Sequence, residues 1–206
     1  MSPRRRSRGR REKTTVLIVG EGQQTEPNCF DGLKREDAVR RRFALTVKGG
    51  PGHSPEAVVR KAIDLKKGAT HRKEYYDQVW CVLDVEGQQK RPSLMEAVAL
   101  AEENGIQLCL SNPSFEVWLL AHFKRRAGFF MNSDSVVTEL NKAWRKHLKR
   151  DYEKNDEQIY HRLSDRTDCA IANAQWVLET HHHGKRCMDA NSSSEVYKLV
   201  GHLLGQ

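Results

Sequence analysis

The sequence predicts an α/β fold, in which a largely parallel sheet of four main strands is flanked by helices. Three observations lead to this prediction. Short apolar runs alternate with helical patterns along residues 14–125. These runs are apolar on both faces, as buried parallel strands are, and after residue 125 only helical patterns remain. We therefore expect a flexible basic arm (1–13), an α/β domain (14–125) and a helical C-terminal extension (126–206) packed on it.

The first predicted elements are a strand, a helix and a second strand. Residues 15–19 are β-branched or apolar throughout, so we expect a buried strand that ends at Gly20. A helix follows from about residue 25 to 36, with Pro27 in its first turn, where proline is tolerated. Residues 43–48 form the second strand, which closes on a glycine-rich turn.

The middle of the domain repeats this order. Ser54 as a cap and Pro55 at the first position start a helix. Residues 78–83 form the third strand, which is followed at once by acids. A capping box at residues 93–96 starts the next helix, and Gly105 ends it.

The last predicted strand, residues 106–110, is followed by helices alone. Pro113 suits the first position of a helix that Ser111 or Asn112 caps. Two further helical patterns follow, and a second capping box at residues 192–195 predicts the start of the final helix.

The basic charge of the chain is concentrated at its N-terminus. The formal net charge is +8, of which residues 1–13 supply +6, leaving +2 for the rest. Such a composition cannot offset the entropy of ordering, so we expect a flexible arm that contacts the phosphates of a nucleic acid. The alternative is an arm that only aids solubility. The arginines concerned are Arg4, Arg5, Arg6, Arg8, Arg10 and Arg11.

Several classes of protein are excluded by the sequence. It has no apolar run of about 18 residues, so we expect no membrane span. The apolar run at 15–19 is too short for a secretory signal, so we expect a cytoplasmic protein. Five cysteines without a CxxC pair predict neither a disulfide framework nor a zinc site.

Acidic residues follow three of the four predicted strands. They are Glu21, Asp84, Glu86 and Glu116. The carboxyl ends of parallel strands share one edge of a sheet, where ligands of such folds bind. Carboxylates gathered there need a counter-ion, and Mg²⁺ or Mn²⁺ suits oxygen ligands. We expect the side chains of residues 84 and 86 to point the same way from an extended segment. His53, after the second strand, is expected at the same edge beside a phosphate.

Two other phosphate-binding motifs are considered for the first loop. The run GEGQQT at residues 20–25 has the G-x-G of a dinucleotide-binding turn, but the third glycine is missing and Glu21 would face the pyrophosphate. A Walker A loop fails because no Gly-Lys-Ser/Thr follows.

The residues around these acids resemble a known family. LIVGEGQQTEPNCF (17–30), YDQVWCVLDVEG (76–87), SNPSFEVWLLAHF (111–123) and ANSSSEVYKLVGHLL (190–204) are similar, in this order, to the RloB-like family of bacterial defence proteins, which has a Toprim-like fold. The resemblance covers most of residues 14–205.

The resemblance implies a Mg²⁺ site for cleaving or rejoining nucleic-acid strands. By position, Glu21 would be the general acid/base or a metal ligand, and Asp84 and Glu86 would be the DxD pair. The sequence departs from DxD because its second acid is Glu86. Glu116 is our own addition as a third candidate acid. The resemblance also implies an AAA or OLD-type ATPase partner, encoded nearby, and a role in abortive infection against phage.

Three functions remain open from the sequence. The first is a Mg²⁺-dependent Toprim-type nuclease subunit acting on DNA or RNA. The second is a catalytically silent Toprim-like subunit that binds a nucleic acid or nucleotide and docks on an ATPase. The third is a phosphohydrolase of small phosphate esters, since an Asp-x-acid pair with Mg²⁺ suits that reaction too.

Overall fold

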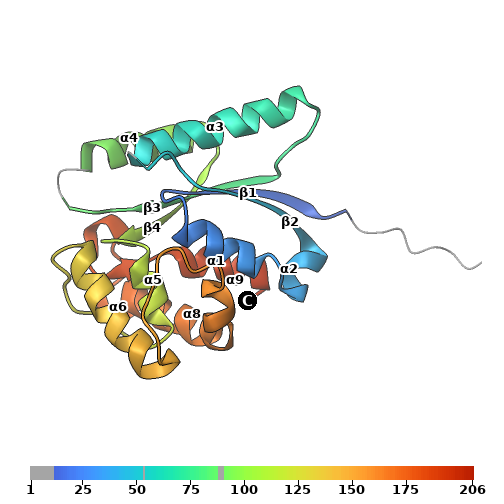
Figure 1. Ribbon diagram of the computed structural model, residues 1–206. Helices are drawn as coiled ribbons and strands as arrows, with labels where there is room; N and C mark the ends of the chain where they lie inside the picture. The colour runs from blue at the N-terminus through green and yellow to red at the C-terminus, as the bar shows by residue number, and fades with distance from the viewer. Residues whose placement is uncertain (1–11, 53, 88–90) are drawn as a thin grey trace, which may run out of the picture.

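A five-stranded sheet with helices on both faces forms the centre of the molecule (Figure 1). The computed structural model describes residues 12–52, 54–87 and 91–206. The strand order is β2-β1-β3-β4-β5, with the first four strands parallel and β5 antiparallel to β4. This arrangement confirms the predicted α/β fold with four main parallel strands. The strands are β1 Thr14–Gly20, β2 Phe43–Lys48, β3 Gln78–Asp84, β4 Gln107–Asn112 and β5 Ser193–Ser194.

The central strands are buried on both faces, as the continuous apolar runs predicted. Ile18 of β1 pairs with Val47 of β2 on one side and with Trp80 of β3 on the other. Side chains of both pleat directions in β1 and β3 lie in the core, because helices cover both faces of the sheet.

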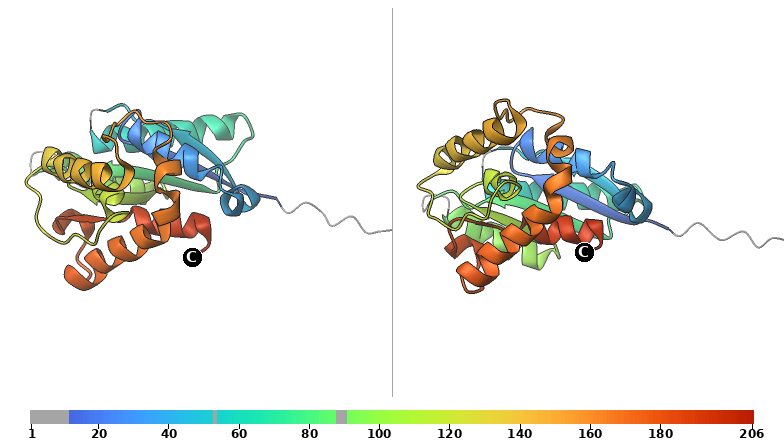
Figure 2. Two further views of the ribbon diagram at one scale, coloured as in Figure 1. Left: turned by 60° about the horizontal axis from the view of Figure 1, so that its bottom comes forward. Right: turned by 90° about the horizontal axis from the view of Figure 1, so that it is seen from below.

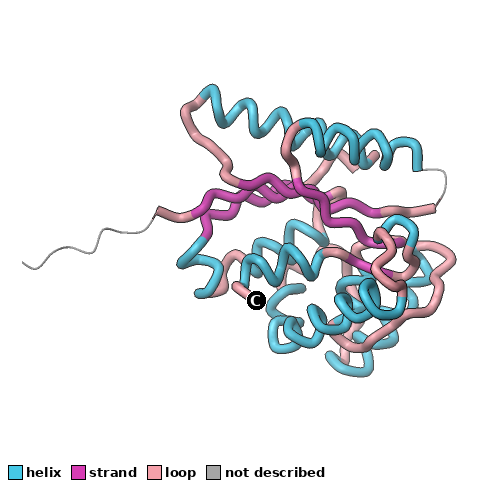
Figure 3. The backbone as a smooth tube through the Cα atoms, turned by 180° about the vertical axis from the view of Figure 1, so that it is seen from behind, coloured by secondary structure: helices cyan, strands magenta, loops and turns pink. Residues whose placement is uncertain are grey.

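Two helices cover one face of the sheet, and the other helices form the opposite layer. The first layer consists of α3 Pro55–His71 and α4 Arg91–Glu103. The second contains α1 Thr25–Leu33, α2 Asp37–Arg42, α5 Glu116–Ala121, α6 Ser133–Leu148, α7 Ile159–Leu163, α8 Thr167–Gln175 and α9 Val196–Leu204. From below, α8 and α9 lie side by side (Figure 2), and from behind the sheet separates the two layers (Figure 3). Short 3-10 turns at Ser164–Arg166 and Cys187–Asp189 and a π-helical turn at Trp176–His181 complete the second layer.

The predicted start of α3 is confirmed. The backbone N–H of Ala57 donates to Oγ of Ser54, and Pro55 occupies the first turn. None of the helices in the described part of the chain has both the length and the apolar character needed to cross a membrane.

Three predicted helix starts are wrong. α4 already includes Arg91, so Ser93 of the predicted capping box lies within the helix and does not cap it. The other two wrong starts involve the same pair of strands. β4 continues to Asn112, so α5 begins only at Glu116 and not at Pro113. The capping box at 192–195 instead supplies β5, and α9 begins at Val196. Oγ atoms of Ser111 and Ser194 lie 2.8 Å apart in a buried hydrogen bond between the two strands. Serines that favour helix caps when exposed therefore serve here as buried partners within the sheet.

Candidate functional site

The sheet order reverses between β1 and β3, which is where ligands of open α/β sheets bind. An open pocket of about 290 Å³ lies at the carboxyl ends of these strands. Its walls include all four acids that the sequence singled out, Glu21, Asp84, Glu86 and Glu116, together with a fifth, Glu26. The fold therefore brings the predicted acids together.

A hydrogen bond joins the ends of β1 and β3 inside this pocket. The backbone N–H of Asp84 donates to Oε2 of Glu21 at 3.0 Å, and Glu21 is buried. The loop that carries Glu21 is packed tightly against the glycine turn after β2. A Cβ atom on Gly50 would lie 2.4 Å from the carbonyl oxygen of Gly20 and 2.6 Å from that of Glu21. Only glycine allows this close approach of two backbones.

Glu26, in the first turn of α1, is a site residue that the sequence did not single out. Its Oε1 accepts a hydrogen bond of 2.9 Å from the backbone N–H of Gly22. A Cβ atom on Gly20 would lie 2.8 Å from Cβ of Glu26, and a Cβ atom on Gly22 would lie 2.7 Å from Oε2 of Glu26. The spacing G-E-G-x-x-x-E could have revealed it, but an acid in a first helical turn is common because of the helix dipole. Burial raises the pKa of Glu26.

Glu116 is buried and held by three partners. Ser114 Oγ donates to its Oε2 at 2.7 Å, while Tyr152 Oη (3.3 Å) and Lys154 Nζ (3.2 Å) contact its Oε1. Tyr152 and Lys154 come from the segment between α6 and α7, far along the chain. No motif connects them to the acids, so sequence spacing could not find them. Thr25 strengthens this contact, because its hydroxyl donates to the carbonyl of Lys154 at 3.0 Å.

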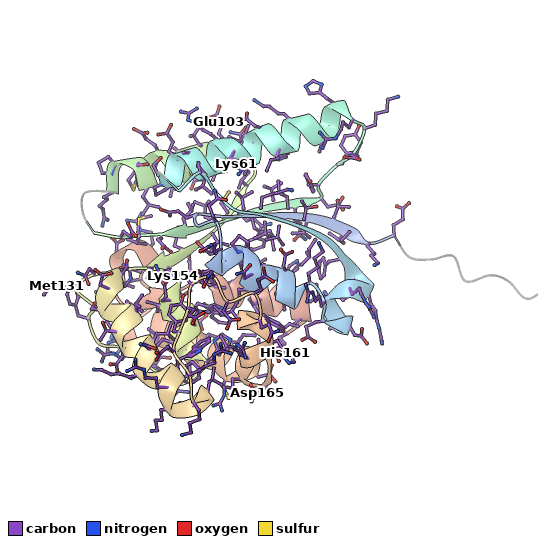
Figure 4. All side chains as sticks on the ribbon, viewed as in Figure 1. Lys61, Glu103, Met131, Lys154, His161 and Asp165 are labelled. Carbon is purple, nitrogen blue, oxygen red and sulfur yellow. The ribbon has the colours of Figure 1, made fainter. Side chains whose placement is uncertain are left out.

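Lys154 is the one basic residue among the described residues that line the pocket. Figure 4 shows it near the middle of the molecule, below the sheet. Burial lowers the pKa of its amine, but the negative charge of Glu116 outweighs this, so the pKa of Lys154 is raised overall.

The excess of negative charge is greatest around Asp84. Burial raises the pKa of Asp84 well above its usual value, and the charges of the surrounding glutamates raise it further. These are, in decreasing order of effect, Glu26, Glu21, Glu116 and Glu86. In the described part of the pocket wall, five carboxylates face one ammonium group, which creates a strong attraction for a cation.

The backbone turns sharply at Glu86. Glu86 has φ +30° and Gly87 has φ +28°, and the N–H of Glu86 donates to the carbonyl of Pro113 at 2.9 Å. The chain is therefore not extended at Glu86, although the expected i, i+2 alignment of Asp84 and Glu86 assumed an extended segment. The two residues nevertheless line the same pocket, as that expectation required. A positive φ in a residue with a side chain costs energy, and such strain concentrates at functional sites.

The donor set fits a hard divalent cation, because every acidic ligand candidate offers oxygen. In this conformation, no group of three or more His, Cys, Asp or Glu side chains within residues 12–52, 54–87 and 91–206 is arranged to hold a metal ion. Binding an ion would therefore require carboxylates to turn from the partners described above. The predicted nucleic-acid contacts Arg4, Arg5, Arg6, Arg8, Arg10, Arg11 and His53 lie outside the described residues.

Comparison with known proteins identifies one family. The family model described as RloB-like protein matches residues 16–203, a range that includes all five acids of the pocket and the described strands except the first two residues of β1. No curated protein and no solved structure matches the chain.

Proposed function

The chain belongs to the RloB-like family, and we propose that it is the nuclease subunit of a bacterial anti-phage system, cleaving phosphodiester bonds of DNA or RNA with Mg²⁺ or Mn²⁺. One observation carries this proposal. Among the described residues, five carboxylates centred on Asp84 share one pocket with one lysine, at the point where the sheet order reverses. The parallel sheet flanked by helices is consistent with a Toprim-like arrangement.

The acids of the pocket divide into two roles. Asp84, Glu86 and Glu116 would hold the cation, with Glu21 as a further ligand. When bound, Mg²⁺ would supply Lewis-acid chemistry, polarising a phosphoryl oxygen and favouring ionisation of water. We assign proton transfer to the carboxylate of Glu21, which the N–H of Asp84 fixes in place.

Glu26 and Lys154 extend the site beyond the acids found from sequence. Glu26 holds the Glu21 loop through the N–H of Gly22, and the raised pKa of its buried carboxyl suits a second proton carrier. Lys154 places a positive charge at the pocket wall, where the phosphate of a substrate would enter.

The proposal also includes a partner that the resemblance to the RloB-like family implies. A separate AAA or OLD-type ATPase, encoded nearby, would regulate the subunit in the cytoplasm. Nucleic acid would be held in part by the basic arm, through its arginines.

The test is a cleavage assay with the purified chain on supercoiled plasmid, linear DNA and total RNA, in Mg²⁺, Mn²⁺ or EDTA. Asp84→Asn and Glu21→Gln are compared with Asp64→Asn, an exposed aspartate of α3. Metal-dependent cutting that both pocket variants lose and the control keeps supports the nuclease. If the chain and its ATPase together bind nucleic acid but never cut it, the silent binding subunit is the better description. Turnover of chromogenic phosphate esters alone would indicate a phosphohydrolase.

A further inference from the structure

Two large apolar side chains are exposed beside the carboxylate pocket. Phe129 is 74% exposed and Met131 is 83% exposed. Figure 4 shows Met131 at the outer margin of the molecule, on the side of the sheet that carries Lys154. Leaving such side chains in water is unfavourable, so an exposed pair at the edge of a cavity indicates a binding surface.

The segment that carries Phe129 and Met131 is held in place by the residue between them. Phe130, between the two, is buried, and its backbone exchanges two hydrogen bonds of 2.8 Å with the amide of Asn191. The guanidinium of Arg126 lies 4.8 Å from the centre of the Phe130 ring. Because Phe130 is anchored inward, Phe129 and Met131 are directed outward before any ligand arrives. A pre-positioned aromatic ring loses little entropy on binding.

These side chains line a groove that leads to the acids. A hollow of about 490 Å³ has Phe129, Met131, Pro113 and Gly87 among its lining residues. A second hollow of about 250 Å³ shares the last three of these residues and also contacts Glu86. Glu86 lines the carboxylate pocket as well. Glu86 therefore stands between the carboxylate pocket and the second hollow, and that hollow borders the larger one. The larger hollow is of the size that binds a small ligand, about 300–1,000 Å³.

The charge of the groove differs from that of the pocket. Arg91 lines it and pairs with Oδ1 of Asp189 at 2.6 Å. Arg186 pairs with Oδ2 of the same carboxylate at 3.0 Å. Two guanidinium groups thus share one carboxylate. This cluster carries one positive charge in excess, and its members Arg91 and Asp189 line the same hollow as the exposed phenylalanine. An aromatic ring next to a positive charge suits a base with its phosphate.

We propose that this groove binds an unpaired nucleotide next to the scissile phosphodiester, with its base stacked on Phe129 against Met131 and its phosphate beside Arg91. The proposal rests on the proposed function and narrows its substrate to single-stranded DNA or RNA, or to a single-stranded segment of a larger nucleic acid. A base held within a duplex is already stacked on its neighbours and cannot stack on the ring.

The test is binding of single-stranded oligonucleotides that contain 2-aminopurine, a base whose fluorescence is quenched by stacking. The full chain carrying Asp84→Asn is titrated at physiological ionic strength, followed by anisotropy and by quenching. Adding Phe129→Ala should weaken single-strand binding about tenfold and remove the quenching, since stacking on one aromatic ring contributes that much. Phe129→Trp should keep both. Tyr75→Ala and Met95→Ala, which remove other exposed apolar side chains, are the controls.

The outcomes separate this proposal from the nuclease proposal. Selective loss of single-strand binding with Phe129→Ala, while duplex binding is unchanged, supports the groove even if the wild-type chain never cuts. Unchanged single-strand binding and quenching overturn it, even if the wild type cuts duplexes. A change of oligomeric state with Phe129→Ala, but no change in binding, also overturns it and assigns the surface to a protein contact.

Discussion

The backbone N–H of Asp84 donates a hydrogen bond of 3.0 Å to Oε2 of Glu21. This bond joins the ends of the two strands between which the sheet order reverses. It also fixes one carboxylate beside another, because the donor is the backbone of the second acid. The negative charge of the pocket is therefore imposed by the fold, and the following predictions test its consequences.

Asp84→Asn is expected to stabilise the metal-free protein at neutral pH, because burial and the surrounding glutamates disfavour the ionised form of Asp84. The folded pKa of Asp84 is raised, so its contribution to stability is present below the usual value of 3.8 and is lost as pH rises through the folded pKa. Denaturant unfolding of the wild type and of Asp84→Asn in EDTA, at a series of pH values from about 4 to about 8, measures this.

The experiment must compare the wild type with Asp84→Asn, because His122 also changes the stability of the fold with pH. Burial lowers the pKa of His122 to about 4, which destabilises the fold as pH falls below 6.5, in the direction opposite to Asp84. His122 is present in both proteins, so its effect cancels in their difference. If the difference in free energy of unfolding between Asp84→Asn and the wild type does not grow with pH, the pKa of Asp84 is not raised in the folded protein.

Glu26→Gln is expected to lower metal-dependent cleavage by about a hundredfold, the size typical of losing a positioned proton carrier. The amide oxygen can still accept the N–H of Gly22, so the fold should be kept. Single-turnover cleavage rates and thermal unfolding are measured together. Glu103→Gln, at the end of α4 in the opposite helical layer, should change neither (Figure 4). Full activity in Glu26→Gln would remove Glu26 from the site.

Lys154→Gln is expected to raise Mn²⁺ affinity by about three- to tenfold, because the pocket loses a positive charge 3.2 Å from Glu116. Cleavage should fall at the same time, since the charge that faces the phosphate is gone. Calorimetric titration and cleavage rates measure the two effects separately. Lys146→Gln, on the exposed side of α6, is the control. Weaker Mn²⁺ binding in Lys154→Gln would show that the lysine supports the ion instead of competing with it.

Gly50→Ala is expected to lower both stability and cleavage. Its Cβ would lie 2.4 Å from a backbone oxygen of the loop that carries Glu21, so one of the two backbones must shift. Gly68→Ala tests the alternative that any added methyl group is harmful. Gly68 lies within α3, and the atom nearest to an added Cβ would be 3.7 Å from it. Alanine at this position should therefore stabilise the protein by about 0.5–1 kcal/mol. Thermal unfolding of the two variants should therefore shift in opposite directions.

Much of the sheet could be predicted from the sequence because its strands are continuous apolar runs. The second strand has the predicted bounds, Phe43–Lys48, and the third differs by one residue, at Asp84. The fifth strand could not be predicted, because a two-residue pairing of serines carries no periodic signal. Its position depends on contacts such as Ser111 with Ser194, which are far apart in the chain.

The candidate site also has one part that the sequence predicts and another part that it does not. The four predicted acids follow strands or lie near their ends, so topology alone brings them together. Glu26 completes the spacing G-E-G-x-x-x-E, but an acid in a first helical turn is too common to single it out. Lys154 reaches the pocket only because the segment between α6 and α7 folds back onto α1, where Thr25 holds it. Such long-range contacts depend on packing, which local sequence patterns do not encode.

Calorimetric titration of the full chain with Mn²⁺ measures whether the carboxylates around Asp84 bind a divalent cation, the property on which the proposed function depends. The wild type and Asp64→Asn are expected to bind Mn²⁺ saturably, and Asp84→Asn is expected to bind it at least about tenfold more weakly, the effect of losing about 1.4 kcal/mol of attraction. Equal affinity for Mn²⁺ in Asp84→Asn and the wild type, or a wild type that binds no Mn²⁺, would contradict it.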